Sequence, residues 1–91
     1  MASISDNQQP HFPARTVMKI ITEMPGSVRV QEMRLEEVFH KLMLKPKPWS
    51  QKSSGKQKYM SFTTEVYIQN REQLHSLYDN LQQLPEVKQV L

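Results

Sequence analysis

Residues 58–70, with the sequence KYMSFTTEVYIQN, alternate between apolar and other side chains, which predicts a β-strand with one buried face. The side chains expected in the core are Met60, Phe62, Thr64, Val66 and Ile68. The opposite row consists of Tyr59, Ser61, Thr63, Glu65 and Tyr67. A strand with two such different faces indicates a sheet that packs on one side and leaves its other side open.

The chain of 91 residues has room for one hydrophobic core, which we assign to residues 13–91. Residues 1–12 are polar and show no apolar period, so we expect a disordered tail. The absence of cysteine excludes disulfides and thiolate metal sites and is typical of a reducing compartment. The chain has neither a run of about 18 apolar residues nor a secretory signal pattern. These features predict a cytoplasmic protein.

The first part of the domain predicts a strand followed by a helix. Residues 15–22 are apolar and β-branched on both faces, as in a central strand. Pro25 and Gly26 end this strand, and Ser27 can cap a helix over residues 27–43. The core stripe of that helix is Leu35, Val38, Phe39 and Leu42, with Met33 or Val28 extending it toward the N-terminus.

The segment between this helix and the alternating strand is rich in proline and lysine. Residues 44–50 suit only an edge strand, because Pro46 and Pro48 have no N–H to donate to a sheet. Trp49 is expected to pack against the body of the domain. Residues 53–55 have turn chemistry, so the two strands should form a hairpin with a lysine-rich tip.

The last part of the chain predicts a second helix and a short strand. Asn70 can cap the helix, Gln73 can complete a capping box, and Pro85 prevents its continuation. Residues 87–91, VKQVL, suit a final strand. The apolar side chains of the helix lie at the 3.6-residue period: Leu74, Leu77, Tyr78, Leu81 and Leu84. We expect Phe62 to contact three of them, Leu74, Leu77 and Leu81.

The element order β-α-β-β-α-β predicts an α+β protein with the ferredoxin-like split βαβ fold. This fold has a four-stranded antiparallel sheet with both helices on one face. The first and third strands lie in the centre, and the second and fourth strands form the edges. The row that begins at Tyr59 and ends at Tyr67 should therefore point to the open face.

The C-terminal half resembles the YbeD-like family of small bacterial proteins of unknown function, which have an ACT-like, ferredoxin-like fold. The pattern is Ser-x-x-Gly, Tyr-x-Ser, a Leu-x-x-x-Tyr-x-x-Leu helix and a closing Val-Lys-x-Val-Leu, and the resemblance is close over residues 53–91. The residues that match are Ser53, Gly55, Tyr59, Ser61, Leu74, Tyr78, Leu81, Val87, Lys88, Val90 and Leu91.

The resemblance implies a non-catalytic regulatory or interaction module that acts through a protein partner or a small effector. A role in regulating lipoate metabolism has been suggested for some members of the family. ACT domains often bind effectors near the turn after the first strand, which here contains Gly26 and Ser27. The unpaired N–H groups at the start of the helix also favour an anion there, although the same residues fit a capped helix without any ligand.

Lysines define a second candidate surface. Five of them and no acid lie between positions 45 and 58, a pattern that fits either a solvated loop or a binding patch. The alternative function is therefore a nucleic-acid-binding module that uses the open sheet and this hairpin, although Glu65 between the tyrosines would repel phosphate. The candidate interaction residues are Lys45, Lys47, Lys52, Lys56, Lys58, Tyr59 and Tyr67.

No motif in the chain indicates catalysis, a cofactor or a metal. His11, His40 and His75 are too dispersed in the sequence for a metal site. The stretch SSGKQ lacks the earlier glycine and the following Ser or Thr of a phosphate-binding loop. We therefore expect no enzyme activity.

We expect the domain to be mainly monomeric and not membrane-bound. Pro46 and Pro48, together with Lys45 and Lys47, should block pairing along the second strand. The edge formed by residues 87–91 is the weaker barrier, and we expect any added strand to pair there.

Overall fold

The computed structural model describes residues 12–91. Its elements, in chain order, are β1 (Ala14–Glu23), α2 (Val28–Lys41), β2 (Ser50–Ser53), β3 (Tyr59–Ile68), α3 (Arg71–Gln82) and β4 (Val87–Val90). The predicted tail lies outside the described residues except for Phe12, which packs against the core. The boundary of the domain therefore remains a prediction.

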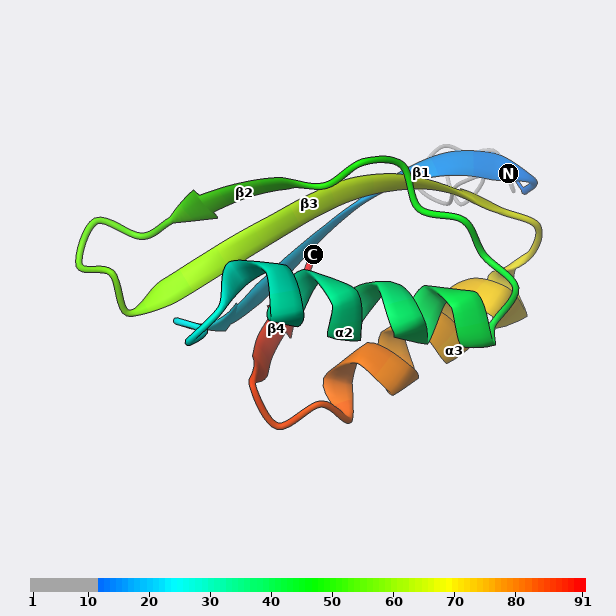
Figure 1. Ribbon diagram of the computed structural model, residues 1–91. Helices are drawn as coiled ribbons and strands as arrows, with labels where there is room; N and C mark the ends of the chain where they lie inside the picture. The colour runs from blue at the N-terminus through cyan, green and yellow to red at the C-terminus, as the bar shows by residue number, and fades with distance from the viewer. Residues whose placement is uncertain (1–11) are drawn as a thin grey trace, which may run out of the picture.

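The four strands form one sheet in the order β2-β3-β1-β4, and every neighbouring pair is antiparallel. Both helices lie on the same face of this sheet (Figure 1). The predicted ferredoxin-like fold is therefore confirmed, with β1 and β3 in the centre. Figure 1 also shows the β2–β3 hairpin extending past the start of α2, so part of the sheet projects beyond the helices.

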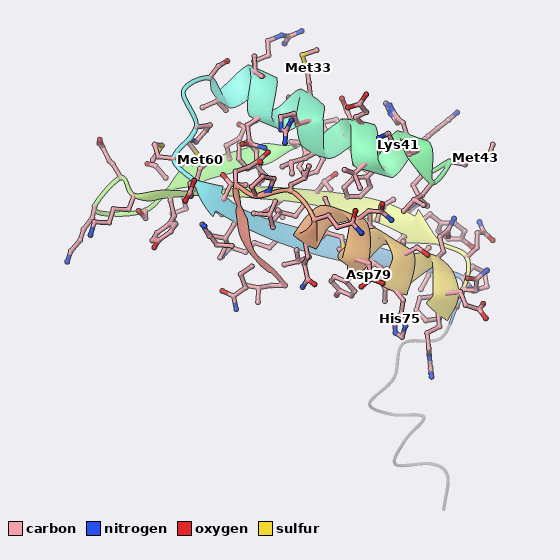
Figure 2. All side chains as sticks on the ribbon, turned by 90° about the horizontal axis from the view of Figure 1, so that it is seen from below. Met33, Lys41, Met43, Met60, His75 and Asp79 are labelled. Carbon is pink, nitrogen blue, oxygen red and sulfur yellow. The ribbon has the colours of Figure 1, made fainter. Side chains whose placement is uncertain are left out.

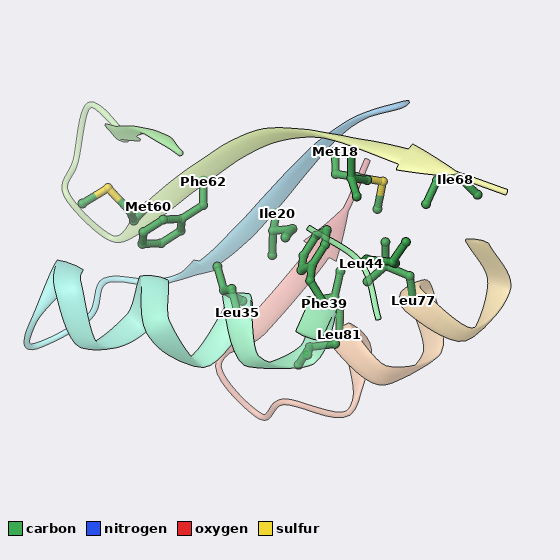
Figure 3. Close-up of a cluster of buried hydrophobic side chains, with 12 residues drawn as sticks. Met18, Ile20, Leu35, Phe39, Leu44, Met60, Phe62, Ile68, Leu77 and Leu81 are labelled. Atoms are coloured by element: carbon green, nitrogen blue, oxygen red, sulfur yellow. The ribbon is translucent and has the colours of Figure 1, made fainter. Parts of the chain in front are cut away.

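The core lies between the sheet and the helices (Figure 3). The alternation predicted for β3 is confirmed, because all five residues of its even-numbered row are buried. Met18, Ile20 and Thr22 of β1 extend the buried row across the sheet. Antiparallel pairing places Ile20 opposite Phe62, so the two central strands present one continuous apolar surface to the helices.

Helix α2 begins after its predicted cap, and its core stripe is confirmed at Leu35, Val38 and Phe39. The proposed extension of this stripe is wrong, because Met33 is 57% exposed and Val28 is 37% exposed. Met33 is two residues from Leu35, or about 200° around the helix, whereas position 31 is four residues away and returns to the same side.

Gln31 is the buried residue at that position, although its side chain is polar. Its Nε2 donates a hydrogen bond of 2.9 Å to Glu86 Oε2, in the turn before β4. Arg34 Nε donates to the same oxygen at 2.6 Å, and Arg34 Nη2 donates to Glu86 Oε1 at 3.1 Å. Glu86 thereby joins the C-terminal turn to α2 and satisfies the buried amide.

The second strand begins where the sequence predicted it to end. Residues 44–49 lie alongside β3 but do not form a strand, because Pro46 and Pro48 interrupt regular pairing. Lys47 still takes part, since its N–H donates to the Glu65 carbonyl at 2.9 Å and its carbonyl accepts from Thr64 Oγ1 at 2.6 Å.

Trp49 packs against the core as expected. Its ring meets Phe39 edge-on, with 5.4 Å between ring centroids, and Phe62 edge-on at 6.4 Å. The contact expected between Phe62 and α3 is wrong. Figure 3 places Phe62 over α2 beside Leu35, with Leu77 at the other end of the core. The reason is topological: α3 starts directly after β3 and therefore covers the end of that strand farthest from the hairpin.

Candidate functional site

The uncovered face of the sheet carries the odd-numbered rows of β1 and β3. Their register pairs Tyr59 with Glu23, Ser61 with Ile21, and Thr63 with Lys19. Among residues 12–91, no helix covers this face (Figure 1). Tyr59 and Tyr67 are 45% and 50% exposed, so both rings are available to a ligand, as the alternation in β3 predicted.

One end of this face is hollowed into a shallow groove, which we call the hairpin groove. It has a volume of about 390 Å³ and lies where β1, β2 and β3 approach the hairpin turn. Its lining includes Lys19, Ile21, Lys52, Ser54, Tyr59 and Ser61. The groove therefore combines two ammonium groups with one aromatic and one aliphatic side chain.

The hairpin turn is fixed chiefly by Ser54. Its hydroxyl accepts hydrogen bonds from the N–H groups of Lys58 and Tyr59 at 3.1 and 3.2 Å. Its own N–H donates to the Tyr59 carbonyl at 2.9 Å. Gly55 lies in the turn, as residues 53–55 predicted, and Gln57 takes the left-handed conformation with φ of 55°. Tyr59 is consequently held at the mouth of the groove by several backbone contacts.

The seven predicted interaction residues are not all brought together. Lys52 and Tyr59 line the hairpin groove, and Lys56 and Lys58 line a second hollow on the adjoining turn, together with Tyr59. The remaining three, Lys45, Lys47 and Tyr67, lie elsewhere: the lysines precede β2, and Tyr67 is near the opposite end of β3.

The turn at Gly26 and Ser27 serves the helix that follows it. Ser27 Oγ accepts a hydrogen bond of 3.2 Å from the Val30 N–H, as a helix cap does. Gly26 has no positive φ, and a side chain in its place would meet open space. An effector or anion site at this turn stays a prediction.

The residues of the family pattern fall into three structural roles. Ser53, Gly55, Tyr59 and Ser61 belong to the hairpin and its groove. Leu74, Tyr78 and Leu81 pack from α3 into the core. Val87, Lys88, Val90 and Leu91 form the last strand and its end, where Lys88 Nζ lies 3.1 Å from Glu23 Oε2 and Leu91 exchanges backbone hydrogen bonds with Lys19.

The helices carry two further hollows with titratable side chains. One is lined by His75 and Asp79 of α3, and the other by Met33 and His40 of α2. Figure 2 labels His75, Asp79 and Met33 on these two helices. Within residues 12–91, no group of three or more His, Asp or Glu side chains could hold a metal ion, and His11 lies outside them. None of the helices in this described part is long and apolar enough to cross a membrane.

Sequence reasoning missed three residues of the groove: Lys19, Ile21 and Ser54. The signal for Lys19 and Ile21 was available, because residues at every second position of a strand share a face. The apolar residues on both faces of 15–22 obscured this alternation. Ser54 could not be separated from Ser53 without the geometry of the turn.

The model of a family described as "Protein of unknown function (DUF493)" matches residues 7–91. This match confirms the resemblance found in the C-terminal half and extends it over most of the chain. No functionally curated protein matches the chain.

The solved structures of similar fold include the following three. The solution structure of protein HP0495 from H. pylori has a TM-score of 0.69 and 20% identity, over 96% of this chain and 92% of that one. The C-terminal domain of MgtC from Mycobacterium tuberculosis has a TM-score of 0.67 and 12% identity, over 91% and 88%. The ACT domain of GTP pyrophosphokinase from Chlorobium tepidum has a TM-score of 0.65 and 14% identity, over 85% and 94%. At these identities the similarity establishes the ACT-like fold alone.

Proposed function

Because the chain belongs to the DUF493 family, whose function is unknown, and has an ACT-like fold, we propose that it is a non-catalytic regulatory or interaction module. It acts through a protein partner or a small effector. The observation that carries this proposal is the uncovered sheet face, where Tyr59, Tyr67 and the 63% exposed Val17 present apolar surface beside charged groups. Large side chains that a monomer leaves uncovered on a rigid sheet are suited to recognition.

The chemistry of the groove supports a binding role over a catalytic one. The Ser54 hydroxyl already accepts two backbone hydrogen bonds, and the Ser61 hydroxyl donates to the Lys52 carbonyl at 3.2 Å. A nucleophilic serine needs a neighbouring base to activate it, and neither hydroxyl is hydrogen-bonded to a base among residues 12–91. The module works in the cytoplasm as a monomer, a location that suits a chain without cysteine.

Nucleic-acid binding is the second candidate function. Lys56 and Lys58 lie beside Tyr59 on the hairpin turn, and aromatic rings flanked by cations can stack bases and contact phosphates. Glu23 and Glu65 on the same face oppose a polyanion. The two functions differ in their salt dependence, since the logarithm of a nucleic-acid affinity falls steeply with the logarithm of salt concentration.

The test compares amide spectra of the ¹⁵N-labelled full chain with and without bacterial lysate in the same buffer. Dialysis divides the lysate into a small-molecule fraction and a macromolecular fraction. The macromolecular fraction is tested both before and after nuclease treatment. If the small-molecule fraction shifts or broadens the amide signals of the uncovered face, the chain binds a small effector. If the nuclease-treated macromolecular fraction does so, the chain binds a protein partner. Loss of the effect after nuclease treatment would favour nucleic acid. Unchanged spectra with every fraction, or conversion of a lysate component that depends on the chain, would contradict the proposal.

A further inference from the structure

The hairpin groove carries two cationic side chains that form no ion pair with any of residues 12–91. Among residues 12–91, neither Lys19 nor Lys52 forms an ion pair, whereas Lys88 on the same sheet is paired with Glu23. The strand register places Lys19 opposite Thr63 and Lys52 opposite Ser61, which is one row nearer the hairpin turn on β3. Strand and row spacings put their Cα atoms about 12 Å apart, so both ammonium groups can reach over Ser61.

The same groove has an apolar side. Tyr59 is half-exposed at its mouth, and Ile21 lies directly opposite Ser61 on β1. A flat apolar group placed against Tyr59 would therefore bring an attached anion within reach of the lysines. Aromatic contacts and charge-assisted hydrogen bonds would then act on one molecule from two directions.

The groove is also held in shape before any ligand arrives. Ser54 fixes the turn that carries Tyr59, and Ser61 Oγ bonds to the backbone of Lys52 across the two strands. A preformed site loses less conformational entropy on binding than a flexible loop does.

We propose that the hairpin groove binds a small ligand that joins a carboxylate or phosphate group to a planar apolar body. The lysines at positions 19 and 52 hold the anion, and Tyr59 packs against the planar part. This inference rests on the proposed function, since it assigns the site and the chemical class of the effector.

Two observations favour a small ligand over a polymer. The volume of about 390 Å³ falls within the range of small-molecule sites. Carboxylates also border the groove: Glu23 is opposite Tyr59, and Glu65 is two residues beyond Thr63 on β3. A long polyanion following the strands would meet Glu65, whereas a compact anion over Ser61 would not.

The test is a titration of the ¹⁵N-labelled full chain at pH 7 and low salt with four probes: phenyl phosphate, benzoate, inorganic phosphate and phenol. Saturable shifts are expected for one or both aromatic anions at the amides of Lys19, Lys52, Tyr59 and Ser61. Inorganic phosphate should bind more weakly because it cannot pack against Tyr59. Phenol should not saturate, because it carries no anion. Comparison of phenyl phosphate with benzoate identifies which anion the groove prefers.

Matched variants assign the effect to the groove. Changing both groove lysines to glutamine (Lys19→Gln with Lys52→Gln) should weaken the better aromatic anion by at least about tenfold. The control removes two exposed cations from α2 by combining Arg29→Gln with Lys41→Gln, and should leave the affinity within about twofold, the effect expected from long-range charge. Tyr59→Leu should reduce the preference for phenyl phosphate over inorganic phosphate.

The inference is overturned if no probe saturates, if the shifts map outside the groove, or if the lysine pair and the α2 control lose equal affinity. It is also overturned if oligothymidylate or an acidic peptide binds more tightly than the aromatic anions and shifts the amides as far as Tyr67. If a lysate fraction still shifts amide signals of the uncovered face after such a result, the proposed function is retained. Its binding site then lies outside the hairpin groove.

Discussion

Glu86 shows how much of this small fold depends on one side chain in a turn. Its carboxylate accepts hydrogen bonds from Arg34 and Gln31, and it is mostly buried, with 18% of the side chain exposed. The donors, Arg34 first, lower the pKa of Glu86 from 4.5 to about 2, and the same contact raises the pKa of Arg34. The exposed half of the Arg34 side chain limits what this pair contributes to stability.

We expect Glu86→Ala to lower the free energy of unfolding by roughly 2 kcal/mol, because it removes a charge-assisted contact and leaves the buried Gln31 amide without an acceptor. Glu86→Gln keeps an oxygen for Gln31 and should cost about half as much. Urea melts at pH 7 measure both changes. Equal costs for the two variants would show that Gln31 does not depend on this contact.

The lowered pKa of Glu86 also predicts an acid dependence of stability. A carboxyl group whose pKa falls on folding contributes fully above its unfolded value of 4.5, and the contribution is lost as the pH falls from 4.5 toward 2. The wild-type chain should therefore lose more stability over this interval than Glu86→Gln does. Melts at a series of pH values test this, and parallel curves for the two proteins would contradict it.

The sequence allowed prediction of the residues whose role follows from a local period, and few of the others. The buried row of β3 was predictable because one strand carries all of its members. The contact between Gln31 and Glu86 joins positions 55 residues apart, and it puts a polar residue on the core stripe of a helix. No local pattern identifies such a pair, because its partner is determined only by the packing of α3 and β4 beside α2.

At the scale of elements, the helix caps were predictable and the second strand was not. Asn70 Oδ1 accepts from the Gln73 N–H at 2.8 Å, and Gln73 Oε1 accepts from the Gln69 N–H at 2.7 Å, one residue before the position that a capping box requires. A cap depends on neighbours in the sequence. The position of β2 depends on where Trp49 enters the core, which is a tertiary effect.

Asn70→Ala should destabilise the domain by about 1 kcal/mol, since it leaves the Gln73 N–H without its acceptor. Asn70→Asp retains an acceptor and adds a charge that suits the helix N-terminus, so its cost should be near zero. Thermal melts followed by far-ultraviolet circular dichroism compare the two variants. A similar loss in both would remove the cap as the explanation.

Substitutions of Trp49 test whether its ring fixes the irregular segment before β2 to the core. Its Nε1 is buried and has no hydrogen-bond partner within the described residues. Trp49→Phe removes that donor but keeps an aromatic ring against Phe39 and Phe62, so we expect little change in stability. Trp49→Ala should cost about 3 kcal/mol, the low end for loss of a core aromatic ring, because this ring is partly exposed. Denaturant melts that rank the two variants equally would contradict this packing.

At the scale of the whole molecule, we still predict a monomer, but for a different structural reason at the β2 edge. Pro46 and Pro48 precede β2 and do not protect its edge, which depends instead on its four-residue length and on Lys52. The β4 edge is equally short. Light scattering over a concentration series should give the monomer mass. A stable micromolar dimer would contradict this, and if Gln89→Pro failed to disrupt that dimer, pairing through β4 would be excluded as well.

Every proposal for the hairpin groove depends on a sheet with one buried and one uncovered face. The most direct measurement is a pair of urea melts on Phe62→Ala and Tyr67→Ala, which lie on the two faces of the same strand. Phe62 is fully buried, so its loss should cost about 3–5 kcal/mol, whereas the loss of half-exposed Tyr67 should cost less than about 1 kcal/mol. Equal losses, or a larger loss for Tyr67→Ala, would contradict the assignment of the faces.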